Sequence, residues 1–305
     1  MESLKSNNIT CVQKCKNYLA KAALLGFDSG FTFEYYDHDP NRVTLKRYDD
    51  ILSKETVEIP EFVTVIGSYC FSDCTSLKEI KLPDNVTMIE KCAFENCSSL
   101  ENICLSENLS WICWNAFENC RLLKSIKLPP NLKKILKEAF ANTGLEKVEI
   151  PDSVDTIEAG AFKNCRKLKY AALPSSLKLI DNHLFENCVE LEEVNLPPKI
   201  SKIGTAAFYR TAIKKIELSD NVRTIGGSAF SDCYKLEEVN MPKKLGKIGP
   251  KAFAHCAVKE ISFPDNYIVI GNKAFYSCKE LAHVHMNSAS LSLGDGVFDF
   301  CDKFQ

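Results

Sequence analysis

Cysteine and histidine are the residues of this chain whose side chains could carry out chemistry. The 305 residues include 15 cysteines and five histidines. Thr143 and Thr211 stand where a repeated cysteine would fall, and neither a disulfide partner nor a metal ligand tolerates that replacement. The spacing also matches no C-x-x-C zinc pattern. We therefore interpret the nine repeated cysteines as small buried packing residues. They are Cys74, Cys97, Cys120, Cys165, Cys188, Cys233, Cys256, Cys278 and Cys301.

The remaining candidates for chemistry are few. Cys104 and Cys113 fall outside the repeated cysteine position and are the two thiols worth testing for reactivity, although no adjacent histidine supports catalysis. His283 and His285 share one strand face, but the local sequence offers no third metal ligand. The stretch Asp37-His38-Asp39 fits a turn better than a metal loop. Phosphate loops, HExxH and G-x-S-x-G are absent, so we expect no cofactor, no metal and no enzymatic activity.

Two tryptophans form the other distinctive feature. Trp111 and Trp114 flank Ile112, while equivalent positions elsewhere in the chain are mainly polar or small. If both are exposed, they form an interaction hot spot by residue type; a local packing irregularity that buries one of them is the alternative. Both interpretations stay open. We predict that the partner-binding residues are Trp111, Trp114, Tyr170, His283 and His285.

These residues are positioned by an internal repeat, for which phenylalanine supplies the register. Each unit reads L-x-x-I/V-x-L-P-x-x-V/L-x-x-I-G/E-x-x-A-F-x-x-C. After Phe140, Phe208 and Phe253 the next aliphatic residue comes one position early, so one residue is lost from a turn. Eleven phenylalanines recur every 22 or 23 residues, namely Phe71, Phe94, Phe117, Phe140, Phe162, Phe185, Phe208, Phe230, Phe253, Phe275 and Phe298.

The repeat predicts a solenoid. Between Leu77 and Pro83 the residues alternate inward and outward as in a strand, and proline then ends the strand because it has no N–H for a ladder. The Ile-Gly segment predicts a second short extended stretch, and Ala-Phe-x-x-Cys predicts a tight helical or 3₁₀ turn. A unit this short cannot bury its own apolar face, so neighbouring units must stack into one continuous core.

The repeat also closely resembles the BspA-like class of leucine-rich repeats, from about Glu55 to Phe304. The resemblance implies a right-handed leucine-rich-repeat solenoid, α/β or mainly β, with about eleven repeats of 22–23 residues and parallel strands on the concave face. Members of this class are often bacterial or protist surface proteins that bind host or partner proteins. By resemblance we therefore expect protein binding, with cell adhesion as one form of it.

Residues 1–54 do not match the repeat and predict an N-terminal cap, with the array occupying residues 55–305. Residues 11–25 have helical composition and spacing. Residues 31–36 and 42–48 flank a turn-forming segment, which predicts a hairpin. A cap of this kind covers the first edge of a repeat array.

Charge and hydropathy narrow the partner classes. The 38 basic and 40 acidic residues nearly balance, which excludes a basic nucleic-acid binder. No segment has the roughly 18 consecutive apolar residues of a membrane span. The polar start has no signal-peptide pattern, so we expect either an intracellular protein or one whose leader was removed. Opposite charges alternate along one column of outward strand positions, which favours ion pairing between neighbouring units. The column consists of Lys78, Glu101, Lys124, Glu146, Lys169, Glu192, Lys214, Glu237 and Lys259.

These observations favour a non-catalytic protein–protein recognition module, which binds through its strand face or through the region of Trp111 and Trp114. A surface adhesin or host-interaction protein is the form that the resemblance implies. An intracellular interaction scaffold is the form that the absent leader favours. The alternative class is a structural spacer that self-associates through the ends of the solenoid.

Overall fold

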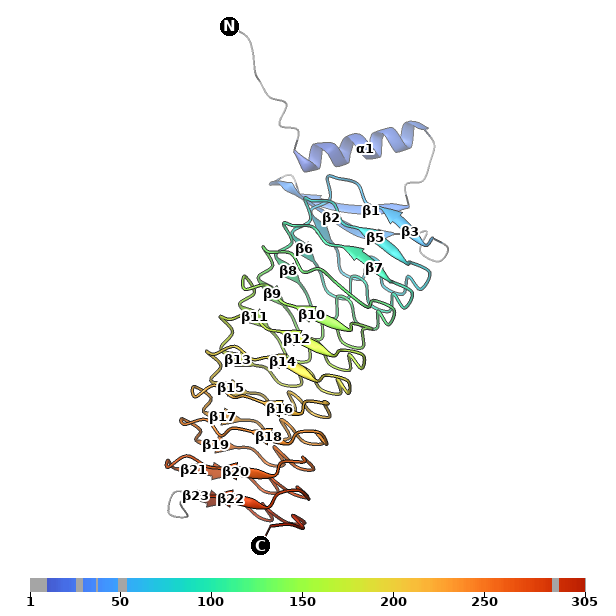
Figure 1. The fold of residues 1–305 in the computed structure, drawn as a ribbon. Coiled ribbons are helices and arrows are strands. Elements are labelled where there is room, and N and C mark those ends of the chain that lie inside the picture. Colours follow the sequence, from blue (N-terminus) through green and yellow to red (C-terminus); the bar gives the residue numbers. More distant parts are fainter. Residues whose placement is uncertain (1–9, 26–29, 37, 49–53, 287–290, 305) are drawn as a thin grey trace.

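The chain forms an elongated solenoid that begins beneath a helix. The computed structural model describes residues 10–25, 30–36, 38–48, 54–286 and 291–304. Helix α1 (Cys11–Leu25) lies across one end, and the repeats follow one another toward the C-terminus (Figure 1). Within the described residues α1 is the one helix, so the fold is mainly β. The predicted solenoid of parallel strands is confirmed, and the helix has the predicted bounds.

One row of short parallel strands, which we call the strand face, comes from the L-x-x-I-x-L segment. In β5 the side chains of Glu79 and Lys81 are exposed while that of Ile80 is buried, as the alternation predicts. The strands of this row are β3 (Thr56–Glu58), β5 (Glu79–Lys81), β7 (Asn102–Cys104), β10 (Lys147–Glu149), β12 (Tyr170–Ala172), β14 (Glu193–Asn195), β16 (Lys215–Ile216), β18 (Glu238–Val239), β20 (Glu260–Ser262) and β22 (His283–His285).

A second row of parallel strands confirms the extended stretch predicted at the Ile-Gly segment. Its isoleucines pair with one another from unit to unit, as Ile89 does with Ile66 and with Ile112. The strands are β4 (Val65–Ile66), β6 (Met88–Ile89), β8 (Trp111–Ile112), β9 (Lys134–Ile135), β11 (Thr156–Ile157), β13 (Leu179–Ile180), β15 (Lys202–Ile203), β17 (Thr224–Ile225), β19 (Lys247–Ile248), β21 (Ile268–Ile270) and β23 (Leu291–Leu293).

The 22-residue units interrupt the strand face. Its sheets are β3-β5-β7, β10-β12-β14, β16-β18 and β20-β22. Two breaks come directly before β16 and β20, the strands that follow the shortened turns after Phe208 and Phe253. The break between β7 and β10 is longer, because residues 121–130 form no strand and β10 then follows the shortened turn after Phe140. A strand that starts one residue early no longer matches the ladder of the unit before it. The core keeps its register across these turns, because the stacked rings of Phe140 and Phe162 remain 5.4 Å apart.

The Ala-Phe-x-x-Cys segment forms a third side of each unit, which we call the turn ridge. The prediction of a helical or 3₁₀ turn is wrong here: the segment is a chain of tight turns with two left-handed residues, such as Tyr69 (φ 59°) and Asp73 (φ 62°). The N–H groups of Tyr69, Phe71 and Asp73 donate to carbonyls of the next unit at 3.0, 2.8 and 2.8 Å. The same three bonds recur at each of the ten junctions between the eleven units, and a helix would have kept them within one unit.

Side-chain amides extend the turn ridge. The second left-handed position is Asn in five units, and Asn tolerates this conformation better than most residues. The Asn96 amide donates to Asp73 Oδ1 at 2.8 Å, and the Asn119 amide donates to Asn96 Oδ1 at 2.8 Å. Asn187 donates to Asn164 in the same way at 3.0 Å. The asparagine before the repeated cysteine is therefore part of a hydrogen-bonded ladder.

The core is a stack of phenylalanine rings lined by cysteine thiols. Successive rings lie 5.1–5.8 Å apart along the stack. The nine repeated cysteines are buried, as predicted. They also have a polar role: the thiol of Cys188 donates to the Phe162 carbonyl of the preceding unit at 3.1 Å. Where threonine replaces cysteine, the Thr143 hydroxyl donates to the Phe140 carbonyl at 2.9 Å.

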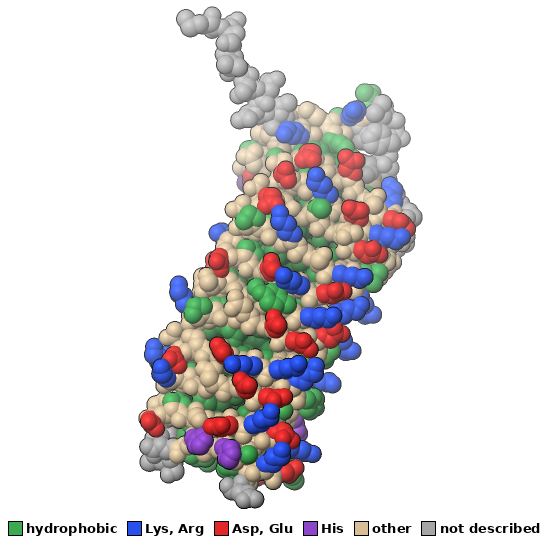
Figure 2. Space-filling view, viewed as in Figure 1, with side chains coloured by type: hydrophobic (Ala, Val, Ile, Leu, Met, Phe, Trp, Pro, Cys, Tyr) green, Lys and Arg blue, Asp and Glu red, His purple; other side chains and the backbone are tan. Residues whose placement is uncertain are grey.

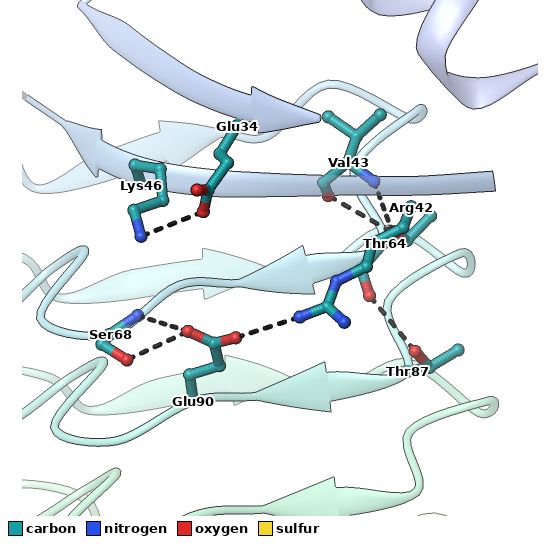
Figure 3. A network of polar contacts seen from close by, with 8 residues as sticks. All are labelled: Glu34, Arg42, Val43, Lys46, Thr64, Ser68, Thr87 and Glu90. Atoms are coloured by element: carbon teal, nitrogen blue, oxygen red, sulfur yellow. Dashed lines mark hydrogen bonds and ion pairs between the residues drawn. The ribbon is translucent and has the colours of Figure 1, made fainter. Parts of the chain in front are cut away.

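The N-terminal residues join the second row directly. Strands β1 (Phe31–Tyr36) and β2 (Asp39–Tyr48) form the predicted antiparallel hairpin, and β2 pairs in parallel with β4. Asp37 of the expected turn lies outside the described residues. Figure 3 shows polar contacts across this junction, where Arg42 approaches Glu90 at 3.6 Å and the same carboxylate accepts the backbone and hydroxyl hydrogen bonds of Ser68. These contacts attach the hairpin to the first two units.

Candidate functional site

Trp111 and Trp114 lie at the surface of the third unit with different exposures. Trp111 of β8 pairs with Met88 on one side and Lys134 on the other, and its ring is half-buried under the Lys134 ammonium, 4.4 Å from the ring centroid. Trp114 follows in the turn and is 50% exposed. Its indole N–H donates to Glu158 Oε2 at 3.1 Å. Neither side chain is buried in the core, and we call these two surface residues the tryptophan patch.

The thiol between the two tryptophans is not an activated nucleophile. Burial raises the pKa of Cys113 to about 11, and the carboxylates of Glu90 and Glu158 add to the rise. A thiol with a raised pKa stays protonated near neutral pH, whereas nucleophilic cysteines have lowered values. Cys104 of β7 is exposed, as its outward strand position predicts.

Tyr170 lies on the strand face, in β12. Its side chain is half-buried, and the Lys147 ammonium of the neighbouring strand β10 lies 5.1 Å from the ring centroid. A cation over an aromatic ring at this distance is a favourable contact. Tyr170 therefore presents an aromatic ring edge to solvent among charged neighbours.

His283 and His285 are exposed on β22, on the same side of that strand, as predicted. Their rings lie 6.5 Å apart, and His285 Nε2 is 3.1 Å from Glu260 Oε1. Among the described residues, His, Cys, Asp and Glu side chains nowhere gather in a group of three or more that could hold a metal ion. The pair is thus exposed beside the carboxylate of Glu260.

The predicted partner-binding residues do not come together into one site. Trp111 belongs to the second row, whereas Tyr170 and the two histidines belong to the strand face. On the strand face, β22 lies five units beyond β12, which is roughly 24 Å at the usual strand spacing. The structure therefore offers three separate surfaces.

The alternating charges of the strand face form ion pairs at two of the nine junctions between neighbouring members of the column. Lys78 binds Glu55 at 2.6 Å, and Lys259 binds Glu237. Glu55 extends the alternating column by one unit, in front of the residues named from the sequence. Acidic and basic side chains are mixed along this side of the molecule (Figure 2), with no extended region of one sign. Ion pairing between units therefore accounts for only part of this column.

The sequence did not identify Glu158 as the partner of Trp114. The two residues are 44 apart, a separation that local motifs do not cover. The repeat spacing could have placed Glu158 near Trp114. The positions equivalent to Trp114 in the next two units are Lys137 and Ala159, and Glu158 is adjacent to Ala159. The Glu158 carboxylate also accepts the Lys137 backbone N–H at 3.0 Å, which fixes its position.

Comparisons with known proteins agree with this architecture. The chain matches the BspA type Leucine rich repeat region (6 copies) over residues 46–169, 156–281 and 246–305. No curated protein matches the chain. Within the described residues, no helix has the length and apolar character that crossing a bilayer requires.

Solved structures of bacterial leucine-rich repeat proteins are similar. A leucine-rich repeat protein from Bacteroides ovatus is 25% identical, with a TM-score of 0.50 and coverage of 90% of this chain and 92% of the other. The T. pallidum leucine-rich repeat protein is 28% identical, with a TM-score of 0.56 and coverage of 68% and 88%. The family match spans well over half of the chain, and the repeat, the stacked core and the parallel rows agree with it. The chain belongs to the BspA-type leucine-rich repeat family.

Proposed function

We propose that this chain is a non-catalytic protein-recognition module. The observation that carries the proposal is the tryptophan patch: two adjacent tryptophans at least partly open to solvent, on a surface where the other units carry mainly polar or small residues. Tryptophan is enriched at the energetic centres of protein interfaces. A leucine-rich repeat solenoid is an interaction scaffold rather than an enzyme fold, which supports the same conclusion.

The frame beneath the patch is suited to recognition because it is preorganised. Ile112, between the tryptophans, is fully buried, and β8 pairs with strands on both sides. The indole of Trp114 is further oriented by its bond to Glu158. Because this surface of the chain is already ordered before a partner binds, the entropic cost of association is lower.

The experiment for this proposal compares captured proteins by crosslinking. The intact chain, the double variant Trp111→Ala/Trp114→Ala and the control Val269→Ala are incubated with cells or extracts of the source organism and its surroundings. Val269 is an exposed apolar residue at the equivalent position of β21. We expect one set of proteins to be lost with the double variant and kept with the control. Equal capture by the folded double variant would contradict the proposal.

We propose a cell-surface adhesin as the biological form of this module. Similar structures include one described as a leucine rich cell surface protein from Faecalibacterium prausnitzii, 21% identical, with a TM-score of 0.52 and coverage of 91% of this chain and 92% of the other. At that identity the likeness shows the fold alone. Surface biotinylation of intact cells tests the location. Labelling only after lysis would favour an intracellular scaffold.

Self-association through the ends of the solenoid is the competing structural role. Helix α1 lies across the N-terminal end, where Val12 and Cys15 join the core. A second copy stacking there would have to displace this helix, so we rank the spacer below the recognition module. Light scattering over a range of concentrations decides between them: we expect a constant mass, and a concentration-dependent mass would restore the spacer.

A further inference from the structure

A groove of about 960 Å³ lies between α1 and the first strand of the strand face, and the tryptophan patch does not line it. One wall comes from α1 and carries Lys14, Asn17, Tyr18 and Lys21. The opposite wall comes from residues 56–62 and, in the next unit, from residues 79–81 and Pro83. The sequence did not predict this groove, because it forms between the N-terminal helix and the first unit rather than within a repeated motif.

The groove contains an open strand edge. In the strand face, β3 pairs with β5 on one side, and no strand of the described residues pairs with it on the other. The N–H of Glu79 in β5 donates backward to the Glu55 carbonyl at 3.1 Å. Thr56 occupies the equivalent position in β3, one unit earlier, and within the described part of the chain its N–H has no acceptor. Since alternate residues of a parallel strand direct their backbone groups to the same side, Glu58 also directs its N–H and C=O to this edge.

The two strand rows differ sharply at this end. The first strand of the second row, β4, is covered by β2, which is covered in turn by β1. The edge of β3 has no such neighbour among the described residues, and Figure 1 shows β3 beside β5 beneath the helix. Proteins usually cover or charge exposed edges, because these edges bind other strands. The edge of β3 is thus the one place where the strand face can be extended backward by an added strand.

The floor of the groove is apolar and fixed. Ile59 and Phe62 are buried, and Val57 is half-buried. The ring of Phe62 lies 5.5 Å from that of Tyr18, which ties the first unit to α1. These side chains give the groove an apolar floor between the edge and the helix, which suits the apolar side chains of an extended peptide.

The two walls differ in charge. The helix wall is basic, with Lys14 and Lys21, and the strand wall is mainly acidic, with Glu58, Glu61 and Glu79 against Lys81. Within the described residues none of these six forms an ion pair. An extended segment between the walls would place acidic side chains near the lysines and basic ones near the glutamates. The walls therefore complement a segment with charges of both signs.

We propose that this groove binds an extended segment of a partner protein, which adds to β3 as a further strand. The backbone of the segment pairs with Thr56 and Glu58, its alternate apolar side chains contact the floor, and an acidic side chain contacts Lys14 or Lys21. The site is independent of the tryptophan patch, so either can fail without the other.

The test is selection of heptapeptides from a random display library on the intact chain. Enriched peptides are then synthesised with a fluorophore and measured by anisotropy. We expect enriched sequences to alternate apolar and polar residues and to include an acidic residue. We also expect bound peptide to slow hydrogen exchange in residues 54–62, measured by mass spectrometry. A library that yields no binder, or peptides that protect another region, would overturn the proposal.

Variants separate this site from others. Thr56→Pro removes one outward N–H for which no described residue is an acceptor. Lys14→Glu/Lys21→Glu reverses the charge of the helix wall. Each change should weaken binding roughly tenfold. Trp111→Ala/Trp114→Ala and the distant Lys133→Glu should leave it unchanged. If the proline variant misfolds by circular dichroism, the charge-reversal variant decides. Binding that resists charge reversal, or a second copy of this chain that competes with the peptide, refutes a partner segment as the occupant.

Discussion

Removing one ring from the phenylalanine stack should destabilise the array more than any surface change. Phe230 is fully buried, and its ring stacks on those of Phe208 and Phe253, each 5.2 Å away. Phe→Ala substitution in a core costs about 3–5 kcal/mol. Two stacked pairs are lost as well, at about 0.5–1.5 kcal/mol each where such pairs have been measured. Because these contributions overlap, we expect Phe230→Ala to lower the free energy of unfolding by about 4–6 kcal/mol.

A matched variant distinguishes stacking from the general effect of losing a phenylalanine. Phe300 is 65% exposed and contacts Tyr276 edge to face, with ring centroids 5.2 Å apart. Phe300→Ala should therefore cost about 0.5–1.5 kcal/mol, the value of one aromatic pair. Phe230→Leu keeps an apolar side chain in the core but loses both ring pairs, so its cost should fall between the two.

Urea unfolding followed by two signals measures these costs. Far-ultraviolet circular dichroism reports the whole array, whereas fluorescence reports the third unit alone, because Trp111 and Trp114 are the only tryptophans. Phe230 lies five units away. If neighbouring units unfold together, Phe230→Ala shifts both transitions equally; if coupling is weak, the dichroism transition moves while fluorescence stays. A cost for Phe230→Ala within about 1 kcal/mol of that for Phe300→Ala would refute the stack as the main source of core stability.

Three further predictions concern single positions. A Cβ on Gly226 would lie 2.6 Å from backbone atoms of the preceding unit. Gly226→Ala should therefore lower the free energy of unfolding by about 1–3 kcal/mol, seen as a lower melting temperature. As the control, Gly246→Ala should leave the melting temperature unchanged, because its Cβ would meet nothing closer than 3.8 Å. Cys188→Thr keeps a donor and should be more stable in urea than the isosteric Cys188→Val by about 1 kcal/mol, the net value of a hydrogen bond; equal stabilities would contradict the role of the thiol. Burial raises the pKa of Cys113, so its alkylation, followed by peptide mass spectrometry, should be slow at pH 8 and should accelerate as the pH rises toward 11; fast alkylation at pH 8 would contradict this.

The sequence predicts the inward positions of this fold well, because each must match its counterpart in the next unit. Phe94, Cys97 and Ile89 stack on equivalents 22 or 23 residues away, so periodicity alone locates them. The helix over residues 11–25 and the hairpin were predictable from composition and turn residues. Each of these features depends on contacts that repeat or on contacts close in sequence.

The turn ridge was less predictable, because its backbone conformation is imposed by neighbouring units. Asn96 and Asn119 signal a left-handed residue, since Asn is enriched there. Glu138 and Lys251 adopt the same conformation, with φ near 56°, although neither residue type favours it. Their N–H groups donate to the next unit at 3.1 and 3.0 Å, and this ladder holds the backbone. The conformational preferences of single residues therefore do not predict the left-handed conformation at these positions.

The surface was the least predictable part. Nothing in the repeat dictates outward residues such as Trp114, so their type was visible in the sequence while their exposure and partners were not. The groove beside α1 had no sequence signal, because it depends on where the helix lies relative to β3. Both surfaces depend on contacts between segments that no periodic rule relates.

The hydrogen bonds that run from each unit to the next along the turn ridge give the solenoid a net dipole along its axis. At every junction three N–H groups point toward the C-terminus and three carbonyls point back, so the peptide dipoles along this ridge add instead of cancelling, as they do along a helix. The ridge is therefore electronegative toward α1 and electropositive toward the last unit. Repeats can be duplicated or deleted in such an array only as whole units in one orientation. In an inverted unit, N–H groups would face the N–H groups of its neighbour, and no hydrogen bonds could form between them.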